Sequence, residues 1–302
     1  KRQGQQLMAI IAEGHRGRVY LPSNHENVRA ALDAQPQWVP ETEMPEQALG
    51  FRVQRYGLPR HGDLFTRRQL AALDTFSALI REVALIIETE AQASAGVMQA
   101  SSVEEWSRSY AYAVATYLGF ALSKGVNYWS ALCSWHQSAE KMVSTFGLPV
   151  LKMVWDFTEA NPFSDSSGNW MLGVEQAAKS LESSLARNPG TATQGDAMHL
   201  QQQHQYVVST DPPYYDNIPY SDLSDVFYVW LRHTLRQMYP DLLSTLLVPK
   251  AQELVADEYR RGSKDAARQH FEQGLGRAFT EILRIQNRSL PVTVYYAFKQ
   301  AE

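Results

Sequence analysis

Apolar residues recur at steps of three and four along the middle of the chain, and this spacing predicts amphipathic helices. The first helix is expected over residues 66–92, with apolar positions at Leu73, Phe76, Ile80, Val83 and Ile87. A second is expected to begin at Ser102, because Ser102 and Glu105 have the spacing of a capping box. Gly125 is expected to interrupt it, and a third helix is expected over residues 127–146. Six apolar residues of the second helix are predicted to lie on one face and to line an aromatic interior between these helices: Val103, Trp106, Tyr110, Val114, Tyr117 and Leu118.

Three more helices are expected in the second half of the chain. The first covers residues 171–187. Ser221 is expected to cap the next one, whose first turn holds Asp222 and Asp225, where the helix dipole favours acidic side chains. The last covers residues 264–287.

Short runs rich in β-branched and aromatic residues predict strands. Two lie near the N-terminus, at residues 17–21 and 51–56, and a third candidate covers residues 191–194. Residues 206–210 and 292–298 have the composition of buried strands, and we expect them to pair in one sheet.

These changes of pattern divide the chain into three parts. Residues 1–64 mix loops and short strands, residues 65–148 form a helical block, and residues 149–302 combine helices with strands. We therefore predict an α/β protein in which a large helical block is inserted in, or appended to, a sheet domain.

Composition narrows the class of protein. The chain has 302 residues, of which 44% are hydrophobic and 20% charged, as in globular proteins. Its formal net charge of −4 argues against a generally basic nucleic-acid-binding protein, so a DNA-binding face would be local. Cys133 is the single cysteine and is expected to be a buried structural thiol, which excludes a disulfide framework and a thiolate metal site. We find no membrane span or signal peptide and expect a cytoplasmic protein.

The candidate chemistry lies where the expected strand 206–210 ends. Pro212 and Pro213 cannot continue a strand ladder, because each fixes φ and lacks an N–H donor. The side chains around them are therefore presented past the carboxyl end of a strand, where open α/β sheets bind ligands. Asp211 and the carbonyl of Pro212 can each accept a hydrogen bond from the exocyclic amine of a flat base. The ring of Tyr214 can stack on that base, an interaction worth about 1–3 kcal/mol.

Residues 211–214 (Asp-Pro-Pro-Tyr) resemble the catalytic motif of S-adenosyl-L-methionine-dependent amino methyltransferases, above all those that methylate adenine in DNA. Residues 211–232 resemble the large bacterial adenine-specific DNA methylases whose complete chains also carry a zinc ribbon. The resemblance extends more weakly to residues 155–163 and 291–302. It implies a partial Rossmann-like methyltransferase sheet, S-adenosyl-L-methionine as the methyl donor and a flipped adenine of DNA as the substrate.

The resemblance also implies roles for individual residues. Asp211, Pro212, Pro213 and Tyr214 would form the catalytic loop, with neither a metal ion nor a covalent enzyme intermediate. The substrate-binding positions would lie at the end of this loop: Tyr215, Asn217 and Tyr220. Asp196 is expected near the adenine of the methyl donor, although an acidic residue in this setting can equally cap a turn.

Two features of the resembled family are not found in the sequence. The glycine-rich turn that follows the first strand, typically acid-x-Phe-x-Gly-x-Gly, is absent, and so are the zinc-ribbon cysteines. The chain begins at Lys1 and ends at Glu302 directly after an expected strand, so we expect a fragment of a longer protein. Isolated, this fragment is expected to be inactive and to bind S-adenosyl-L-methionine weakly or not at all.

Several alternatives stay open at this point. The methyl acceptor is alternatively RNA or a protein amide, although Asp rather than Asn at position 211 favours adenine in DNA. In another hypothesis, the helical block 66–146 is a non-catalytic module that recruits partner proteins of a restriction-modification or phage-defence system. Residues 155–163 are a candidate pocket loop with three polar members, Asp156, Glu159 and Asn161. Basic residues are candidates for phosphate or target contacts, or for an ordinary solvated surface: Arg16, Arg18, Arg52, Arg55, Arg60, Arg260, Arg261 and Lys264.

Overall fold

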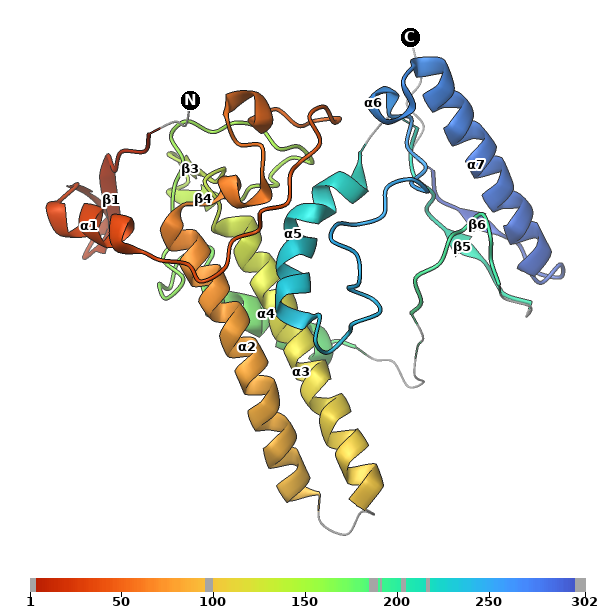
Figure 1. Cartoon of the computed structure of the whole chain (residues 1–302), viewed down its shortest axis with the longest axis horizontal. Coiled ribbons are helices and arrows are strands. Elements are labelled where there is room, and N and C mark those ends of the chain that lie inside the picture. The colour runs from red at the N-terminus through yellow and green to blue at the C-terminus, as the bar shows by residue number, and fades with distance from the viewer. Residues whose placement is uncertain are drawn as a thin grey trace. The chain divides into compact units, whose positions relative to one another are not determined.

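The computed structural model describes residues 4–95, 100–184, 190, 192–201, 205–215 and 218–296 (Figure 1). These residues form a mixed α/β protein with helices and three two-stranded sheets. The chain packs into two compact units. Unit 1 comprises Lys1–Glu46, Phe51–Leu185 and Leu223–Val248, and unit 2 comprises Gln47–Gly50, Ala186–Asp222 and Pro249–Glu302.

Unit 1 opens with an antiparallel hairpin of β1 (Ala9–Gly14) and β2 (Gly17–Pro22), which confirms the strand predicted at residues 17–21. Gly17 takes a φ of +136°, a conformation that favours glycine and allows the tight turn. Helix α1 (His25–Asp33) follows and begins after Asn24, whose side chain accepts the N–H of Asn27 at 2.8 Å.

The strand predicted at residues 51–56 is wrong. Val53–Tyr56 form a 3-10 helix, η1, which ends at Gly57 with a φ of +89°. The N–H of Arg52 donates to the carbonyl of Leu151 at 3.1 Å, and Val53 turns its side chain into the core. A second 3-10 helix, η2 (His61–Leu64), leads into the long helices.

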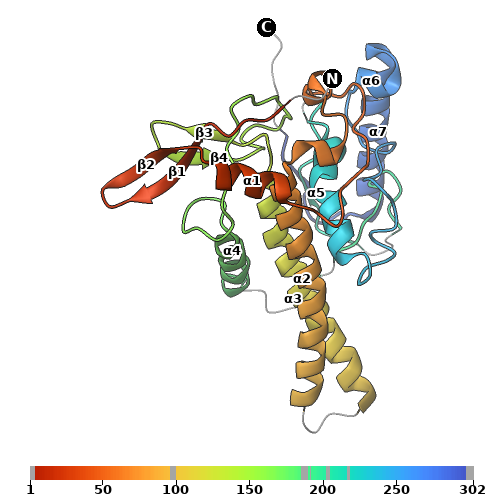
Figure 2. The ribbon, with the colours of Figure 1, turned by 60° about the vertical axis from the view of Figure 1, so that its left-hand side comes forward.

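Helices α2 (Arg67–Ser94) and α3 (Ala100–Tyr128) lie side by side as an antiparallel hairpin (Figures 1 and 2). The helix predicted over residues 66–92 is confirmed, and its start is fixed by a capping box between Thr66 and Gln69. Helix α3 begins at Ala100, so Ser102 lies inside its first turn instead of at the N-cap. Its buried side is made of small and aliphatic residues: Ala111, Ala115, Ala121, Leu122 and Val126.

The aromatic interior predicted for this block is confirmed for Phe76 and Trp129, which are buried with ring centroids 5.4 Å apart, but the inward placement predicted for the aromatic residues of the second helix is wrong. Trp106, Tyr110, Tyr117 and Phe120 are between 36% and 53% exposed, and Trp106 stacks on Tyr110 with ring centroids 5.7 Å apart. At 3.6 residues per turn these four positions lie opposite the buried side of α3. We call them the aromatic face of α3. The helix therefore has two apolar sides, and the side with the small and aliphatic residues is the one buried in the core.

The third helix predicted at residues 127–146 is also wrong. Helix α3 continues through Gly125 to Tyr128, and a hairpin of β3 (Ser134–His136) and β4 (Lys141–Val143) follows. Asn127 binds the returning chain: its carbonyl accepts the N–H of Thr145 at 2.9 Å, and its Oδ1 accepts that of Phe146 at 3.1 Å. Cys133 is buried, as predicted.

Two further helices complete unit 1. Helix α4 (Trp170–Glu182) corresponds to the helix predicted at residues 171–187, although it ends earlier and residues 185–187 lie outside the described part of the chain. Helix α5 (Tyr220–Leu235) starts in unit 2 and continues into unit 1. In unit 1 its Trp230 is fully buried, with ring centroids 5.3 Å from Trp38 and 5.6 Å from Phe65.

Unit 2 contains α6 (Glu258–Arg261) and α7 (Lys264–Ile285). Helix α7 confirms the prediction for residues 264–287, and Ser263 is its N-cap. The candidate strand 191–194 is not observed, because residues 192–194 are exposed and irregular, while Thr191 lies outside the described residues.

The sheet of unit 2 is small. Strands β5 (Ser209–Thr210) and β6 (Thr293–Val294) pair in parallel, which confirms the expected pairing of the two segments. Their predicted burial is wrong, since Val207 is 68% and Tyr295 62% exposed. The part of the chain that the structure describes has no sheet of more than two strands, so it shows the α/β class without a Rossmann-like sheet.

Candidate functional site

The loop that begins at Asp211 follows β5 directly, at the carboxyl end of a parallel strand pair. The pair is held by the N–H of Thr293, which donates to Val208 at 3.0 Å, and by that of Tyr295, which donates to Thr210 at 2.8 Å. Asp211 is exposed, and the next residue, Pro212, is buried. The acidic side chain is thus presented to solvent at the strand end, while the proline after it anchors the loop.

Asp211 and Tyr214 are in direct contact. The hydroxyl of Tyr214 donates to Oδ1 of Asp211 at 3.1 Å. The half-buried ring of Tyr214 also packs edge-on against Tyr296, with centroids 5.3 Å apart and an interplanar angle of 86°. A carboxylate accepts through two oxygens, so Asp211 retains acceptor capacity beside an aromatic ring. This arrangement suits a planar ligand that carries an amine.

The remaining predicted residues of the loop differ in their surroundings. Pro213 is exposed. The carbonyl of Tyr215 accepts the N–H of Ala256 at 2.8 Å, and its ring lies edge-on against Phe271 at 5.4 Å. Tyr220, the first residue of α5, is 59% exposed. Asn217 lies outside the described residues.

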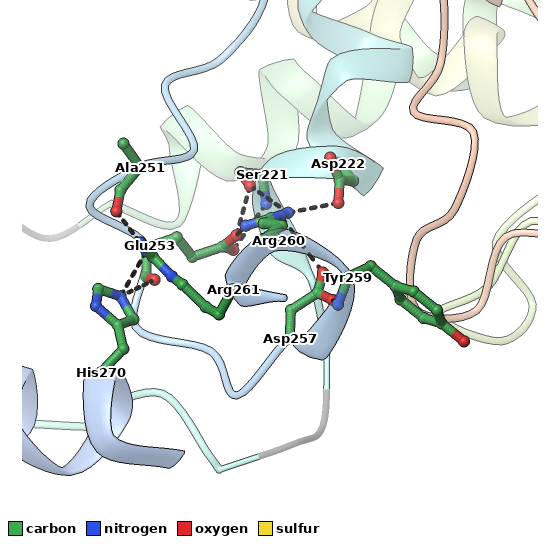
Figure 3. Close-up of polar contacts among 9 residues, drawn as sticks. All are labelled: Ser221, Asp222, Ala251, Glu253, Asp257, Tyr259, Arg260, Arg261 and His270. Carbon is green, nitrogen blue, oxygen red and sulfur yellow. Dashed lines mark hydrogen bonds and ion pairs between the residues drawn. The ribbon is translucent and has the colours of Figure 1, made fainter. Parts of the chain in front are cut away.

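A buried ionic cluster lies at the start of α5 (Figure 3). Arg260 donates to Glu253 Oε2 at 2.5 Å, to the hydroxyl of Ser221 at 3.0 Å and to the carboxylate of Asp222. Its Nε also lies 3.4 Å from Oδ2 of Asp257. Asp222 and Asp257 are 2% and 1% exposed. One guanidinium therefore gathers three carboxylates, and we call these five residues the Arg260 cluster.

Charge attraction explains why an arginine is tolerated in this position. Burial alone would lower the pKa of Arg260, but the hydrogen bonds that it donates to Glu253 and Asp222, and the negative charges of these two carboxylates, raise its pKa above the ordinary value. Buried ion pairs are stable only when their remaining polar atoms find partners. Here Glu253 also accepts the N–H of Ser221 at 2.8 Å, and Asp257 accepts that of Tyr259 at 2.8 Å.

The guanidinium of Arg260 is therefore engaged within the cluster. Arg261, its neighbour, donates to the carbonyl of Ala251 at 2.7 Å and lies 2.8 Å from Nε2 of His270 (Figure 3). Nε2 of His270 also lies 3.1 Å from the carbonyl oxygen of Glu253, so this nitrogen accepts from Arg261 in one tautomer and donates to Glu253 in the other. Of the three C-terminal basic candidates, Lys264 is the exposed one, in the first turn of α7.

Asp196 forms a local turn in unit 2. Its Oδ1 accepts the N–H of Met198 at 2.9 Å, and its Oδ2 lies 3.0 Å from Nδ1 of His199. The hydrogen bond from His199, followed by that from Met198, lowers the pKa of Asp196. These contacts are those of an Asx turn, and a role of Asp196 beside a cofactor stays a prediction.

The candidate pocket loop 155–163 belongs to unit 1. Glu159 pairs with Arg68 at 2.5 Å, whereas Trp155 and Phe163 are exposed. Within the described ranges no group of three or more His, Cys, Asp or Glu side chains could hold a metal ion, and no helix could cross a membrane.

Sequence reasoning missed Glu253, and it offered Arg260 only as a candidate for phosphate or target contacts, because residues 241–262 have no regular pattern. Asp222 is 38 residues from Arg260 along the chain, whereas Glu253 and Asp257 belong to the same segment as Arg260, which is marked only by the density of charges at residues 257–261. Comparisons with protein-family models, with curated proteins and with solved structures find no match to this chain.

Proposed function

We propose that this chain carries the base-binding part of an S-adenosyl-L-methionine-dependent DNA adenine methyltransferase. The observation that supports the proposal is the pair formed by Asp211 and Tyr214, with the hydroxyl 3.1 Å from the carboxylate, at the end of a parallel strand. The sequence around this pair, residues 211–214, resembles the catalytic motif of adenine methylases.

In the proposed reaction, the adenine is flipped out of the duplex at a cost of a few kcal/mol of lost stacking. Asp211 and the carbonyl of Pro212 accept hydrogen bonds from its exocyclic amine, and Tyr214 stacks on the ring. Two acceptors hold the nitrogen in one orientation, so positioning and electrostatics supply the catalysis. S-adenosyl-L-methionine would supply the methyl group: as the nitrogen forms its bond to the methyl carbon, the sulfur–methyl bond would break, S-adenosyl-L-homocysteine would leave, and the nitrogen would lose one proton to solvent.

The sequence and the contacts of Asp196 support only the base-binding half of the site. Asp196 already uses both of its carboxylate oxygens in a local turn. No glycine-rich turn follows a strand in the sequence. The roles proposed for this chain are therefore confined to holding the base.

We also propose that β5 and β6 belong to a larger, Rossmann-like sheet. Parallel strands are normally buried on both faces by helices. Val207, Val294 and Tyr295, however, are exposed beside this pair. Further strands and helices would cover these apolar side chains.

Substitution of Asp211 tests the function. In the intact protein, Asp211→Ala should abolish transfer of a labelled methyl group to DNA and leave DNA binding nearly unchanged. Asp241→Ala, at an exposed aspartate of unit 1, is the matched control. Undiminished methylation by Asp211→Ala would refute the role of Asp211. Competition by RNA or by an amide-containing peptide, instead of DNA, would identify the alternative acceptors.

A second candidate function is favoured by the aromatic face of α3. Four exposed aromatic side chains on one side of a helix are typical of surfaces that bind proteins. The chain would then recruit partner proteins of a defence system through α3. Replacing Trp106 and Tyr117 by Ser should abolish that recruitment in a co-purification assay while methyl transfer continues.

A further inference from the structure

The first turn of α5 is capped from a distant part of the chain. Ile218 and Pro219 precede the helix, and neither has a side chain that could accept from the orphan N–H groups of the first turn. Glu253, 32 residues away, accepts the N–H of Ser221 at 2.8 Å and its hydroxyl at 2.5 Å. A carboxylate at this end of the helix is also favoured by the helix dipole.

Arg260 fixes the carboxylate that does the capping. Its guanidinium contacts Glu253, Ser221 and Asp222 simultaneously (Figure 3). These contacts join the start of α5 to the segment of residues 253–260. The planar fork of arginine suits this geometry, and a lysine would supply only a point charge. Its side chain is 18% exposed, so solvent screens the contacts only weakly.

The same segment holds the catalytic loop at a second point. The N–H of Ala256 donates to the carbonyl of Tyr215 at 2.8 Å. Residues 253–260 thus bind the loop both at Tyr215 and at Ser221. Because Pro212, Pro213 and Pro219 restrict the backbone around these two anchors, a displacement of the anchors would be transmitted along the loop.

We propose that Arg260 is a positioning residue, which sets the placement of Asp211 and Tyr214 through Glu253 and the start of α5. It does not touch the base. Its effect on methyl transfer rests on the proposed function, whereas its effect on the loop does not.

The test combines hydrogen exchange with kinetics on the intact protein. Arg260→Met should speed the exchange of the Ser221 and Ala256 amides by about 10- to 100-fold, since the hydrogen bonds from Ser221 to the carboxylate of Glu253 and from Ala256 to the carbonyl of Tyr215 are loosened. The kcat for methyl transfer should fall about 100-fold, as expected for a misplaced catalytic group, with the KM for DNA unchanged. Arg260→Lys should restore part of both. Arg268→Met, which removes an exposed ion pair with Asp265 on α7, should change neither.

Each outcome decides the inference. Exchange and kcat in Arg260→Met equal to those of Arg268→Met would overturn it. If the wild type transfers no methyl group, the proposed function fails, and the exchange measurements alone decide the role of Arg260. If Arg260→Met does not fold, Glu253→Gln replaces it, with the same expected increase in exchange at Ser221. Loss of the fold in both variants would make the cluster a general stabiliser and would refute positioning.

Discussion

The hydroxyl of Tyr214 donates a hydrogen bond to the carboxylate of Asp211 at 3.1 Å, so one side chain of the strand-end loop orients the other. The ring of Tyr214 is itself held against Tyr296. An acceptor and an aromatic surface are therefore fixed together before any ligand arrives. Because both side chains are already fixed, binding of a ligand would lose less conformational entropy.

The hydroxyl and the ring of Tyr214 make separable contributions. Tyr214→Phe keeps the ring and loses one hydrogen bond, so kcat/KM for methyl transfer should fall by only about 3- to 10-fold, the equivalent of about 1 kcal/mol. Tyr214→Ala also removes stacking and should cost a further 1–3 kcal/mol or so. Equal losses in the two variants would show that the ring does not stack on the base.

Binding of the methyl donor should be weak in this chain by itself. Both oxygens of Asp196 are engaged in its own turn, and the sequence lacks a glycine-rich turn to cradle the donor. Calorimetric titration with S-adenosyl-L-methionine should therefore show little or no heat of binding. Tight binding at a 1:1 ratio would contradict the view that the chain contains only the base side of a site.

Stability should fall at acidic pH because of His233. Burial lowers the pKa of His233 below its ordinary value of 6.5, although the hydrogen bond to Asp74 partly opposes this. Below pH 6.5 the unfolded chain binds a proton that folded His233 does not, so the free energy of unfolding decreases as pH falls toward the folded-state pKa. The slope is at most about 1.4 kcal/mol per pH unit. Above pH 6.5 this histidine contributes no slope.

Urea titrations between pH 5 and 8 measure this effect. His233→Asn should show a flatter dependence of unfolding free energy on pH than the wild type. His15→Asn, at an exposed turn of the β1–β2 hairpin, should keep the wild-type slope. The same slope in all three proteins would assign the acid sensitivity to other groups.

Packing between α2 and α3 should not tolerate a larger side chain. Ala115 is 1% exposed on the packed side of α3, and Ala115→Leu should lower the free energy of unfolding by about 1–3 kcal/mol. Ala113→Leu, two positions earlier on the solvent side of the same helix, should change it by no more than about 0.5 kcal/mol. Similar losses at both positions would contradict the assignment of the packed side.

Helices that are marked by a period of apolar residues could be predicted from the sequence. Which side of each helix is buried could not be predicted. The helices predicted at residues 66–92 and 264–287 are observed, and their caps, Thr66 and Ser263, lie within a few residues of the helix that they start. The caps predicted at Ser102 and Ser221 are wrong, because α3 begins at Ala100 and α5 at Tyr220. The period of apolar residues in α3 is equally clear, but it occurs on two sides. Only the space beside α2 decides that small Ala111 and Ala115 are buried while large Trp106 is exposed.

The candidate site shows the same division. Asp211 and Tyr214 are three residues apart, so their proximity follows from the local sequence. The cluster that fixes the start of α5 depends on contacts between residues 221–222 and 253–260, and no local sequence pattern predicts these contacts. Tertiary contacts of this kind cannot be predicted from the periodicity of apolar residues or from turn-forming residues.

The capping of α5 by Glu253 has a consequence for the order of events during synthesis. At 5–20 residues per second, the ribosome adds the 32 residues from Ser221 to Glu253 in about 2 to 6 s. Throughout that interval the nascent chain contains Asp211 and Tyr214 but not the carboxylate that holds the start of α5. The loop is therefore among the earlier parts of unit 2 to be made and among the later parts to acquire its shape.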